Sequence, residues 1–358
     1  MKKLVFLLLT GYTVSAQTLT KPEQAVMATV TQQLPQTEAL LEKVVNINSG
    51  TLNLQGVRQV GKLMAAEFDK LGFKTEWVSL PDSLNRAGHL VATRQGTKGK
   101  KLFLIGHLDT VFEKSLPMEP FKRVNDSTAT GQGIRDDKGG DVMIIAALKA
   151  LQTQNLLDDT TITVYLTGDE ETGGTPGNPE GRRDFIERAK KHDIALGFES
   201  GLGNNLIVTA KRGATFWILN VKARSGHSSK IFAEMGYGAI YEAARIVNEF
   251  RRALGQEKNL TFNPGLFVGG AEMRYDAKTA EARVVGKDNI VAGTALVKGD
   301  LRYLTNAQKE KAQATMRDIV DKSLPQTKAT ISFTDLMPPM EPTAANEELR
   351  KQLEKIVV

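Results

Sequence analysis

Thr161-Ile-Thr-Val-Tyr-Leu-Thr-Gly-Asp-Glu-Glu171 joins an apolar, β-branched run to two adjacent glutamates. A strand buried in a parallel sheet reads as a short apolar run, and ligands collect outside the carboxyl ends of such strands. The stretch therefore predicts a buried strand from Thr161 to Thr167, followed by Glu170 and Glu171 at its carboxyl end. Acidic side chains gathered at strand ends indicate a metal site.

Two further apolar runs end in the same way. Lys101–Ile105 leads into His107 and Asp109, and Asp193–Phe198 leads into Glu199. If the extended geometry continues past the first of these strands, His107 and Asp109 point to the same side. The repeated arrangement predicts that one imidazole and several carboxylates share one edge of a sheet.

A glycine-rich segment, Gly131–Gly140, carries another acid, Asp136, at the start of a predicted helix. Taken singly, such residues have structural explanations, because an Asp at a helix start is usually a cap and a Glu-Glu pair is usually a solvated turn. Taken together, one histidine and several carboxylates favour Zn²⁺, or a harder ion such as Mn²⁺ or Co²⁺. Of Glu170 and Glu171, one would bind metal and the other would take a proton from metal-bound water.

The composition is that of an ordinary globular protein. The 358 residues are 41% hydrophobic and 25% charged, which is enough material for two domains. The absence of cysteine excludes disulfides, thiolate metal sites and cysteine nucleophiles. The net charge of +6 is mild and dispersed, and no basic stripe is interleaved with aromatic residues, so no nucleic-acid partner is expected.

Residues 1–16 have the pattern of a secretory signal peptide. Two lysines precede an apolar stretch from Leu4 to Leu9, and small residues offer a cleavage site before Gln17. This stretch is shorter than the roughly 18 apolar residues that a membrane span requires. The sequence therefore predicts an exported protein, periplasmic or secreted, with no membrane anchor after signal cleavage.

The order of predicted elements indicates two domains. Helical and strand patterns alternate from Thr18 to Ala210, which argues for an α/β sheet covered by helices. The order then becomes strand, helix (Gly238–Leu254), strand (Leu260–Val268), strand, helix, strand, which is the split β-α-β of a ferredoxin-like domain. Residues 211–337 are therefore expected to form an insertion, and residues 17–210 together with 338–358 the first domain.

The last helical pattern, Glu341–Val358, keeps its apolar spacing and stops without a glycine cap or a polar tail. In an α/β domain, a crossover helix normally leads to another strand. The polypeptide is therefore expected to lack its C-terminal part.

With these residues in view, the chain resembles the dizinc exopeptidase and deacylase family of glutamate carboxypeptidase (carboxypeptidase-G type), acetylornithine deacetylase, succinyl-diaminopimelate desuccinylase and aminoacylase. The resemblance covers roughly Leu40–Leu353 and rests on Gly106–Thr110, Gly131–Gly139 and Asp169–Glu171, with Glu199 following. It implies an α/β fold: a mixed-sheet zinc-peptidase catalytic domain with an inserted ferredoxin-like α+β lid. The lid is also the expected dimerisation domain, so the resemblance implies a homodimer.

The resemblance implies two Zn²⁺ per subunit. His107 and Glu199 would hold one, Asp136 would bridge both, and Glu171 would hold the second. The second zinc of the family also takes a histidine from near the C-terminus, whereas this sequence has no histidine after His227. Either a missing tail supplies it, or this chain binds the second metal poorly.

The resemblance also implies roles for residues that touch the substrate. Glu170 would be the general base, and Asp109 would orient the metal-binding histidine. His227 would reach into the active site of the partner subunit and polarise the scissile carbonyl, while Asn289 and Arg302 would grip the substrate carboxylate. An arginine suits that task because its planar fork meets a carboxylate in two hydrogen bonds. Without the resemblance, His227 would be taken as a loop residue, Asn289 as a turn former and Arg302 as a charged residue at a strand edge.

These expectations describe an exported zinc-dependent metallopeptidase that hydrolyses the amide next to a free carboxylate. It would release a C-terminal glutamate or a similar amino acid from a small peptide or N-acyl amino acid. One alternative is an N-acyl amino acid deacylase or dipeptidase of the same family, since the metal site does not depend on the side group recognised. Another is a homologue that binds rather than cleaves, which the absent second histidine favours and the intact Glu170 disfavours.

Overall fold

The structure is a computed structural model that describes residues 19–157, 159–172, 180–201, 206–277 and 279–355. The chain divides into two units. The first is drawn from Met1–Gly174, Glu180–Ile207 and Glu347–Val358, and the second is built on Val208–Asn346. The signal peptide predicted for residues 1–16 lies outside the described residues.

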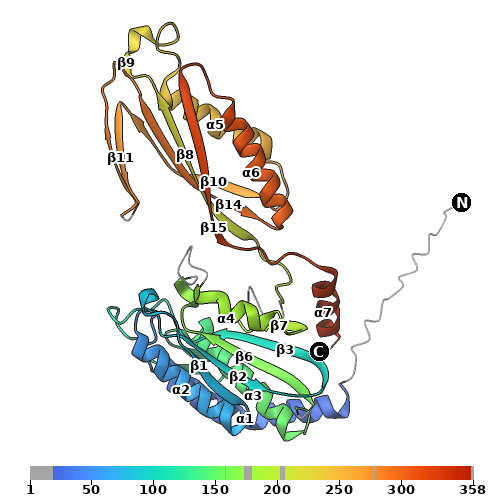
Figure 1. Cartoon of the computed structure of the whole chain (residues 1–358). Coiled ribbons are helices and arrows are strands. Elements are labelled where there is room, and N and C mark those ends of the chain that lie inside the picture. The colour runs from blue at the N-terminus through green and yellow to red at the C-terminus, as the bar shows by residue number, and fades with distance from the viewer. Residues whose placement is uncertain (1–18, 158, 173–179, 202–205, 278, 356–358) are drawn as a thin grey trace, which may run out of the picture. The chain divides into compact units, whose positions relative to one another are not determined.

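The first unit is built on a five-stranded sheet (Figure 1). Its strands are β1 (Lys74–Val78), β2 (His89–Arg94), β3 (Lys98–His107), β6 (Thr160–Thr167) and β7 (Ile194–Gly197). They lie in the order β1-β2-β6-β3-β7. β3 pairs in parallel with β6 and β7, while β2 runs antiparallel to β6 and β1 antiparallel to β2. The predicted mixed α/β sheet is thus confirmed.

Helices cover both faces of this sheet, with α1, α2 and α3 on one face and α4 on the other (Figure 1). On α2, buried apolar residues recur at helical spacing from Val57 to Phe68, so one stripe of the helix packs onto the sheet. On the opposite face, Phe185 of α4 meets Tyr165 edge to face. The bounds are α1 Lys21–Val45, α2 Leu54–Lys70, α3 Gly139–Thr153 and α4 Glu180–Ala189.

The second unit holds a four-stranded antiparallel sheet with helices α5 and α6 on one face (Figure 1). The elements are β8 Gly213–Ala223, α5 Gly238–Leu254, β10 Thr261–Gly270, β14 Thr294–Tyr303, α6 Asn306–Asp321 and β15 Thr327–Met337. The strand order is β10-β14-β8-β15. This succession of strands and helices is the split β-α-β that the sequence predicts for this region.

Side chains alternate between the two faces of this second sheet. Trp217 and Leu219 of β8 are buried in the core with α5 and α6, whereas Phe216 points to the opposite face and is 47% exposed. Arg302 lies on β14 directly opposite Ala214. Opposed residues share a face, so Arg302 lies on the same face as Phe216, away from the helices.

Several short elements were not among the sequence predictions. The hairpin β11–β12 and the pair β9–β13 belong to the second unit, and the hairpin β4–β5 to the first. Most residues of these strands are exposed, so their sequences carry little apolar alternation. Their bounds are β4 Lys122–Asn125, β5 Thr128–Thr130, β9 Gly226–His227, β11 Glu272–Asp276, β12 Glu281–Val285 and β13 Ile290–Val291.

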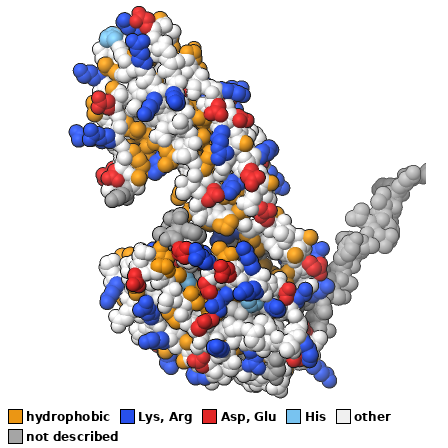
Figure 2. All heavy atoms as spheres, in the orientation of Figure 1, with side chains coloured by type: hydrophobic (Ala, Val, Ile, Leu, Met, Phe, Trp, Pro, Cys, Tyr) orange, Lys and Arg blue, Asp and Glu red, His pale blue; other side chains and the backbone are white. Residues whose placement is uncertain are grey.

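Helix α7, Ala344–Glu354, begins and ends inside the predicted pattern Glu341–Val358. Within the part of the chain that the structure describes, no helix combines the length and apolar character needed to cross a bilayer. On the visible face, basic and acidic side chains are interspersed over both units (Figure 2). This distribution agrees with the mild, dispersed charge of the sequence.

Candidate metal centre

His107 is the last residue of β3 and is fully buried at the carboxyl end of that strand. Its Nδ1 lies 3.0 Å from the carbonyl oxygen of Asp109. A carbonyl oxygen can only accept, so Nδ1 carries the hydrogen and Nε2 is turned to the other partners. Nε2 lies 2.9 Å from Asp136 Oδ1 and 3.7 Å from Glu199 Oε1. Three of the predicted metal ligands therefore converge.

The backbone explains why these ligands meet. Parallel pairing continues past β7 through a hydrogen bond from Phe198 N to Ile105 O of 2.9 Å, which places Glu199 beside the end of β3. Asp136 has non-helical dihedral angles, φ −135° and ψ 94°, and turns its carboxylate towards His107. Its carboxylate therefore joins the cluster and does not form the helix cap that its position in the sequence first suggests.

The cluster is chemically suited to a divalent cation. One ligand atom from each of His107, Asp136 and Glu199 lies within 4.8 Å of the others. Burial opposes charge on the imidazole, but the carboxylates of Asp109 and Glu199 raise the pKa of His107 to about 12. The site thus stabilises positive charge strongly. One imidazole nitrogen and two carboxylate oxygens are a ligand set that Zn²⁺ accepts.

Asp109 connects this cluster to the turn that carries the two glutamates. Its buried carboxylate accepts the backbone amide of Glu170 at 3.0 Å and that of Glu171 at 3.3 Å. The hydroxyl of Thr51 donates to the same carboxylate at 2.6 Å. Burial works against ionisation, but the bonds from His107 and Thr51 hold the pKa of Asp109 below its usual range. Asp109 therefore orients the turn as well as the histidine.

Glu170 and Glu171 begin the 3-10 turn Glu170–Thr172, which is separated from the end of β6 by two residues. Burial, together with the carboxylates of Glu199 and Asp109, raises the pKa of Glu170. Burial and the nearby Asp136 carboxylate raise the pKa of Glu171 to about 7. Glu171 Oε1 accepts the amide of Val111 at 3.2 Å. A carboxylate with a raised pKa is matched to proton transfer near neutral pH, which suits a general base.

Other residues that hold this turn were not predicted from the sequence. Asp169, 1% exposed, is paired with Arg182, whose Nη2 also lies 3.3 Å from the Asp169 carbonyl oxygen. His89 accepts the amide of Gly168 at Nδ1, 3.1 Å away, and its Nε2 lies 3.2 Å from Gly181 O. His89 thus fixes the backbone just before the glutamates. Neither arginine nor histidine carries a local sequence signal for such a contact.

Two buried acids lie behind the metal cluster. The side chains of Asp137 and Asp141 are fully buried, and burial raises the pKa of Asp137 to about 9 and the pKa of Asp141 well above its usual range. Both approach Gly106, where an added Cβ would lie 2.1 Å from Asp141 Oδ1 and 3.0 Å from Asp137 Oδ2. Neither residue was predicted as part of the site from the sequence.

The remaining predicted residues lie in the second unit. His227 belongs to β9, and the Asn289 carbonyl oxygen accepts the amide of Ser228 at 2.9 Å, so the structure brings His227 and Asn289 together. His227 follows the end of β8, where Lys222 pairs with Thr294 at the start of β14. Arg302 lies eight residues farther along β14, which is about 26 Å at roughly 3.3 Å per residue. Arg302 therefore lies at the other end of β14 from the end of β8 that leads to His227.

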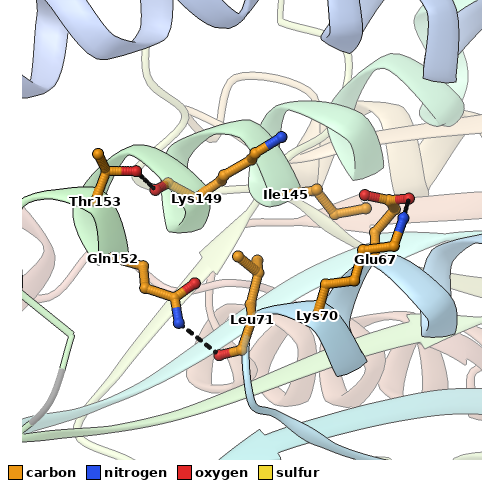
Figure 3. Close-up of a pocket in the computed structure, with 7 residues that line it drawn as sticks. All are labelled: Glu67, Lys70, Leu71, Ile145, Lys149, Gln152 and Thr153. Atoms are coloured by element: carbon orange, nitrogen blue, oxygen red, sulfur yellow. Dashed lines mark hydrogen bonds and ion pairs between the residues drawn. The ribbon is translucent and has the colours of Figure 1, made fainter.

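A surface hollow between α2 and α3, shown in Figure 3, has none of this chemistry. It has a volume of about 280 Å³, and its charged residues include Glu67 and Lys70, which pair with each other at 2.5 Å. Gln152 donates to the backbone oxygen of Leu71 at 3.3 Å. Its polar groups thus bond locally, and the metal cluster remains the candidate site.

The chain matches the family model for peptidase family M20/M25/M40 over residues 103–357. This match covers most of the chain and includes every predicted metal ligand. The chain is a member of peptidase family M20/M25/M40. It is also 30% identical to carboxypeptidase G2 of Pseudomonas sp. (strain RS-16) over 353 residues, which are 98% of this chain and 79% of that protein. The resemblance stated from the motifs is thereby confirmed.

Solved structures agree on the fold of this M20 peptidase. The aminopeptidase PepT of Bacillus cereus superimposes with a TM-score of 0.68 at 19% identity, covering 93% of this chain and 82% of that one. An M20 family metallo-carboxypeptidase of Sulfolobus solfataricus gives 0.53 at 18% identity, covering 85% and 78%. Family membership and the convergent cluster together make this M20 peptidase a metal-dependent hydrolase.

Proposed function

We propose that this M20 peptidase is an exported, zinc-dependent carboxypeptidase of the glutamate-carboxypeptidase type, which hydrolyses an amide next to a free carboxylate. The observation that carries the proposal is the convergence of His107, Asp136 and Glu199, with the Glu170 turn tied to the same centre through Asp109. The relationship to carboxypeptidase G2 supports the choice of bond.

The residues of the site divide the chemistry between them. When bound, Zn²⁺ supplies a Lewis acid and a water of lowered pKa. Glu170 accepts a proton from the attacking water and delivers it to the leaving amine. Asp109 keeps the Glu170 backbone in place, His227 donates to the developing oxyanion, and Arg302 binds the free carboxylate of the substrate.

Substitution of Glu170 tests the assignment of the base. Glu170→Ala is expected to lower kcat for a carbobenzoxy-dipeptide by roughly 10²–10⁴-fold, the usual contribution of general acid–base catalysis, while zinc content stays near that of the native protein. Glu187→Ala, at an exposed acid on α4, serves as the matched control. Native-like hydrolysis by Glu170→Ala would refute the assignment.

We further propose two zinc sites per subunit, the first at His107, Asp136 and Glu199 and the second at Asp136 and Glu171. The nearby Asp136 charge and the raised pKa of Glu171 support a shared cation between these carboxylates. Metal analysis of native protein and Glu171→Gln is expected to show the loss of one zinc per chain. Equal zinc contents would rule out Glu171 as a ligand.

The position of His227 supports a homodimer as part of the proposal. Within one copy of the second unit, His227 lies beyond the Thr294 end of the paired strands β8 and β14, whereas Arg302 lies eight residues from Thr294, about 26 Å along β14 at roughly 3.3 Å per residue. A substrate carboxylate and the adjacent scissile carbonyl are only a few bonds apart. If both residues act on one substrate, they come from different copies of the chain.

The same-class alternative, an N-acyl amino acid deacylase or dipeptidase, shares this metal centre. A panel of N-acyl amino acids, carbobenzoxy-dipeptides and free dipeptides separates the activities, with the carbobenzoxy-dipeptides expected to be the best substrates. Export is tested by sequencing the N-terminus of the protein isolated from its native source. The expected first residue is Gln17, and an intact Met1 in the mature protein would contradict export.

A further inference from the structure

We propose that Arg135 is a positioning residue of the metal centre, whose guanidinium holds the loop that carries Glu199 against the segment that carries Asp136. Residues 199–201 form this loop, the Glu199 loop. The inference rests on the proposed zinc-dependent function, in which Asp136 and Glu199 are ligands of the same ion. It adds a residue on which the affinity for that ion depends.

One hydrogen bond joins the two segments. Arg135 directly precedes Asp136, and Gly201 follows Glu199 by two residues. Arg135 Nη2 donates to the backbone oxygen of Gly201 at 2.7 Å. This distance is at the short end of the range for a charged N–H donor. The bond spans 66 residues of sequence, so it links two segments that are distant in the chain and that each supply a metal ligand.

The segment that carries Arg135 is held by its own backbone. Lys138 N donates to Gly133 O at 3.1 Å, and Ile134 N donates to Gly131 O at 3.3 Å. The segment then leads directly into α3, whose first turn is largely buried. Arg135 therefore extends from a fixed piece of backbone, and it can serve as an anchor for the Glu199 loop.

The Glu199 loop has few bonds of its own. A backbone bond from Phe198 N to Ile105 O, at 2.9 Å, continues the pairing of β7 with β3 by one residue. Among the residues that the structure describes, the bond from Arg135 is the only hydrogen bond that Ser200 or Gly201 forms. The backbone after Phe198 therefore depends on Arg135 for its position.

Packing does not replace this bond. Phe198 lies close against α3, because a Cβ on Gly140 would be 1.9 Å from its backbone oxygen. Beyond Phe198, the Glu199 loop borders a hollow of about 400 Å³, whose other wall includes Gly139 and Met143 of α3. Met143 is itself 56% exposed. Open space and not packed side chains adjoins the loop, so the loop can shift when the bond from Arg135 is absent.

A small shift of the loop is enough to affect the metal site. The Nε2 atom of His107 lies 2.9 Å from Asp136 Oδ1 and 3.7 Å from Glu199 Oε1. Carboxylate ligands bind zinc at about 2.0–2.2 Å, so each ligand atom must be placed closely. His107 is buried at the end of β3, and Asp136 lies in the fixed segment. Glu199 is therefore the ligand whose position depends most on Arg135.

The charge of Arg135 acts in the opposite direction to its hydrogen bond. A guanidinium next to Asp136 repels a divalent cation. Removal of the charge alone would therefore strengthen zinc binding, whereas loss of the hydrogen bond to Gly201 would weaken it. The sign of the change in affinity distinguishes a positioning role from a purely electrostatic effect.

The test titrates zinc into full-length, metal-free protein in competition with a chromophoric chelator. All proteins carry Glu171→Gln, so that the site at His107, Asp136 and Glu199 is measured. Arg135→Met should weaken zinc binding by about 10–100-fold, the usual cost of removing an outer partner of a metal site. Arg135→Lys keeps a charged donor and should restore most of the affinity.

Lys149→Met is the matched control, because Lys149 is an exposed cation on the same helix that follows the site, α3. It removes one positive charge and no bond to the Glu199 loop, so the zinc affinity should stay at the value of the parent protein. Unchanged or tighter zinc binding by Arg135→Met would overturn the inference.

Hydrogen–deuterium exchange of residues 195–201 in the metal-free protein is a second measurement that needs no zinc. Exchange there should be faster in Arg135→Met than in native protein or Arg135→Lys, and exchange in β3 should be unchanged. If native protein binds no zinc, the proposed zinc-dependent function fails, and exchange alone decides whether Arg135 holds the loop. Equal exchange in all three proteins would overturn the inference and leave the proposed function standing where zinc binds.

Discussion

Gly168 donates its amide to Nδ1 of His89 at 3.1 Å, so the hydrogen of this buried imidazole is on Nε2, which faces Gly181 O at 3.2 Å. Protonation of His89 would set an N–H against the Gly168 amide. Burial lowers the pKa of His89, and this outweighs the attraction of the Asp169 carboxylate 4.0 Å away. The neutral ring of His89 therefore helps to position the turn that carries Glu170 and Glu171.

The sign of the resulting pH dependence follows from linkage. The folded-state pKa of His89 lies below the ordinary value of 6.5, so the unfolded chain binds a proton first as the pH falls. The stabilisation is complete above that value and is lost as the pH drops below it, by at most about 1.4 kcal/mol per pH unit. Chemical denaturation between pH 7.5 and pH 5 measures it.

His89→Gln removes this proton and should flatten the dependence of the free energy of unfolding on pH relative to native protein. The two proteins are compared by the slope of the free energy of unfolding against pH. Substitution of a buried residue also changes the absolute stability for reasons other than protonation. Other acids of the site, such as Glu171, titrate in both proteins and cancel in the difference. Parallel slopes for the two proteins would show that His89 does not contribute.

Residue by residue, the sequence pointed to His107 and Glu199 because their chemistry is unusual at strand ends, and to Asp136 because it lies in a glycine-rich segment that the family motif marks. The same reasoning left His89 without a role and gave Thr51 none. Both act through contacts with residues far away in the chain, a separation of 58 residues for Thr51 and Asp109. No local pattern encodes a contact of that kind.

At the scale of elements, the close packing of α3 against the loop after β7 positions Glu199. A Cβ at Gly140, on α3, would lie 1.9 Å from the backbone oxygen of Phe198 and 2.2 Å from Asp137 Oδ1. Glycine is needed there because the obstruction is backbone, which cannot turn aside as a side chain can. The close approach brings the segment before α3, which carries Asp136, and the Glu199 loop to the same metal cluster.

Two glycine substitutions separate this packing from helix or strand propensity. Gly140→Ala should destabilise the first unit by about 1–3 kcal/mol, the cost of overpacking, although alanine is the better helix former. Gly197→Ala, in β7, meets no atom within 4 Å and should be neutral or stabilising by about 0.4–1 kcal/mol. Thermal unfolding and zinc content are the measurements. Equal stability of the two variants would contradict the packing argument.

Elements with strong periodicity were predicted close to their observed bounds. The helix predicted at Gly238–Leu254 has those bounds in the structure, and β6 differs from its prediction only by one residue at its start. The predicted strand Leu260–Val268 is displaced by one or two residues at each end. The β11–β12 hairpin was missed because its pairing partner, and not its own apolar pattern, makes it a strand.

At the scale of the whole molecule, the proposed dimer predicts that the two halves of the active site can be supplied by different chains. His227→Ala and Glu170→Ala should each be nearly inactive alone. When the two proteins are mixed and allowed to exchange subunits, a mixed dimer would carry one site with both residues intact. Recovery of part of the native activity on mixing, measured with a carbobenzoxy-dipeptide, is the expected result.

The control for this experiment is a mixture of His227→Ala with a double variant that carries both substitutions. That mixture has no site with both residues intact and should remain inactive. If the first mixture is equally inactive although subunits have exchanged, as shown by native mass spectrometry, His227 does not act across the dimer.

The sequence by itself determined the type of chemistry and the order of the elements. Apolar runs that end in His107, Glu170, Glu171 and Glu199 encode buried strands with polar residues at their ends, because burial and side-chain charge are local properties of the chain. The motif order also identified the family. These features depend on neighbours in the sequence, so they can be read without coordinates.

Only the tertiary structure decided which residues meet. The hydrogen bonds of Asp109 to the Glu170 turn, of Thr51 to Asp109 and of Gly168 to His89 all follow from strand register and helix packing. Register and packing are properties of the whole chain, since each depends on contacts between segments far apart in sequence. The physical reason is that a buried contact joins two residues that are far apart in the sequence. No short stretch of sequence contains both partners of such a contact.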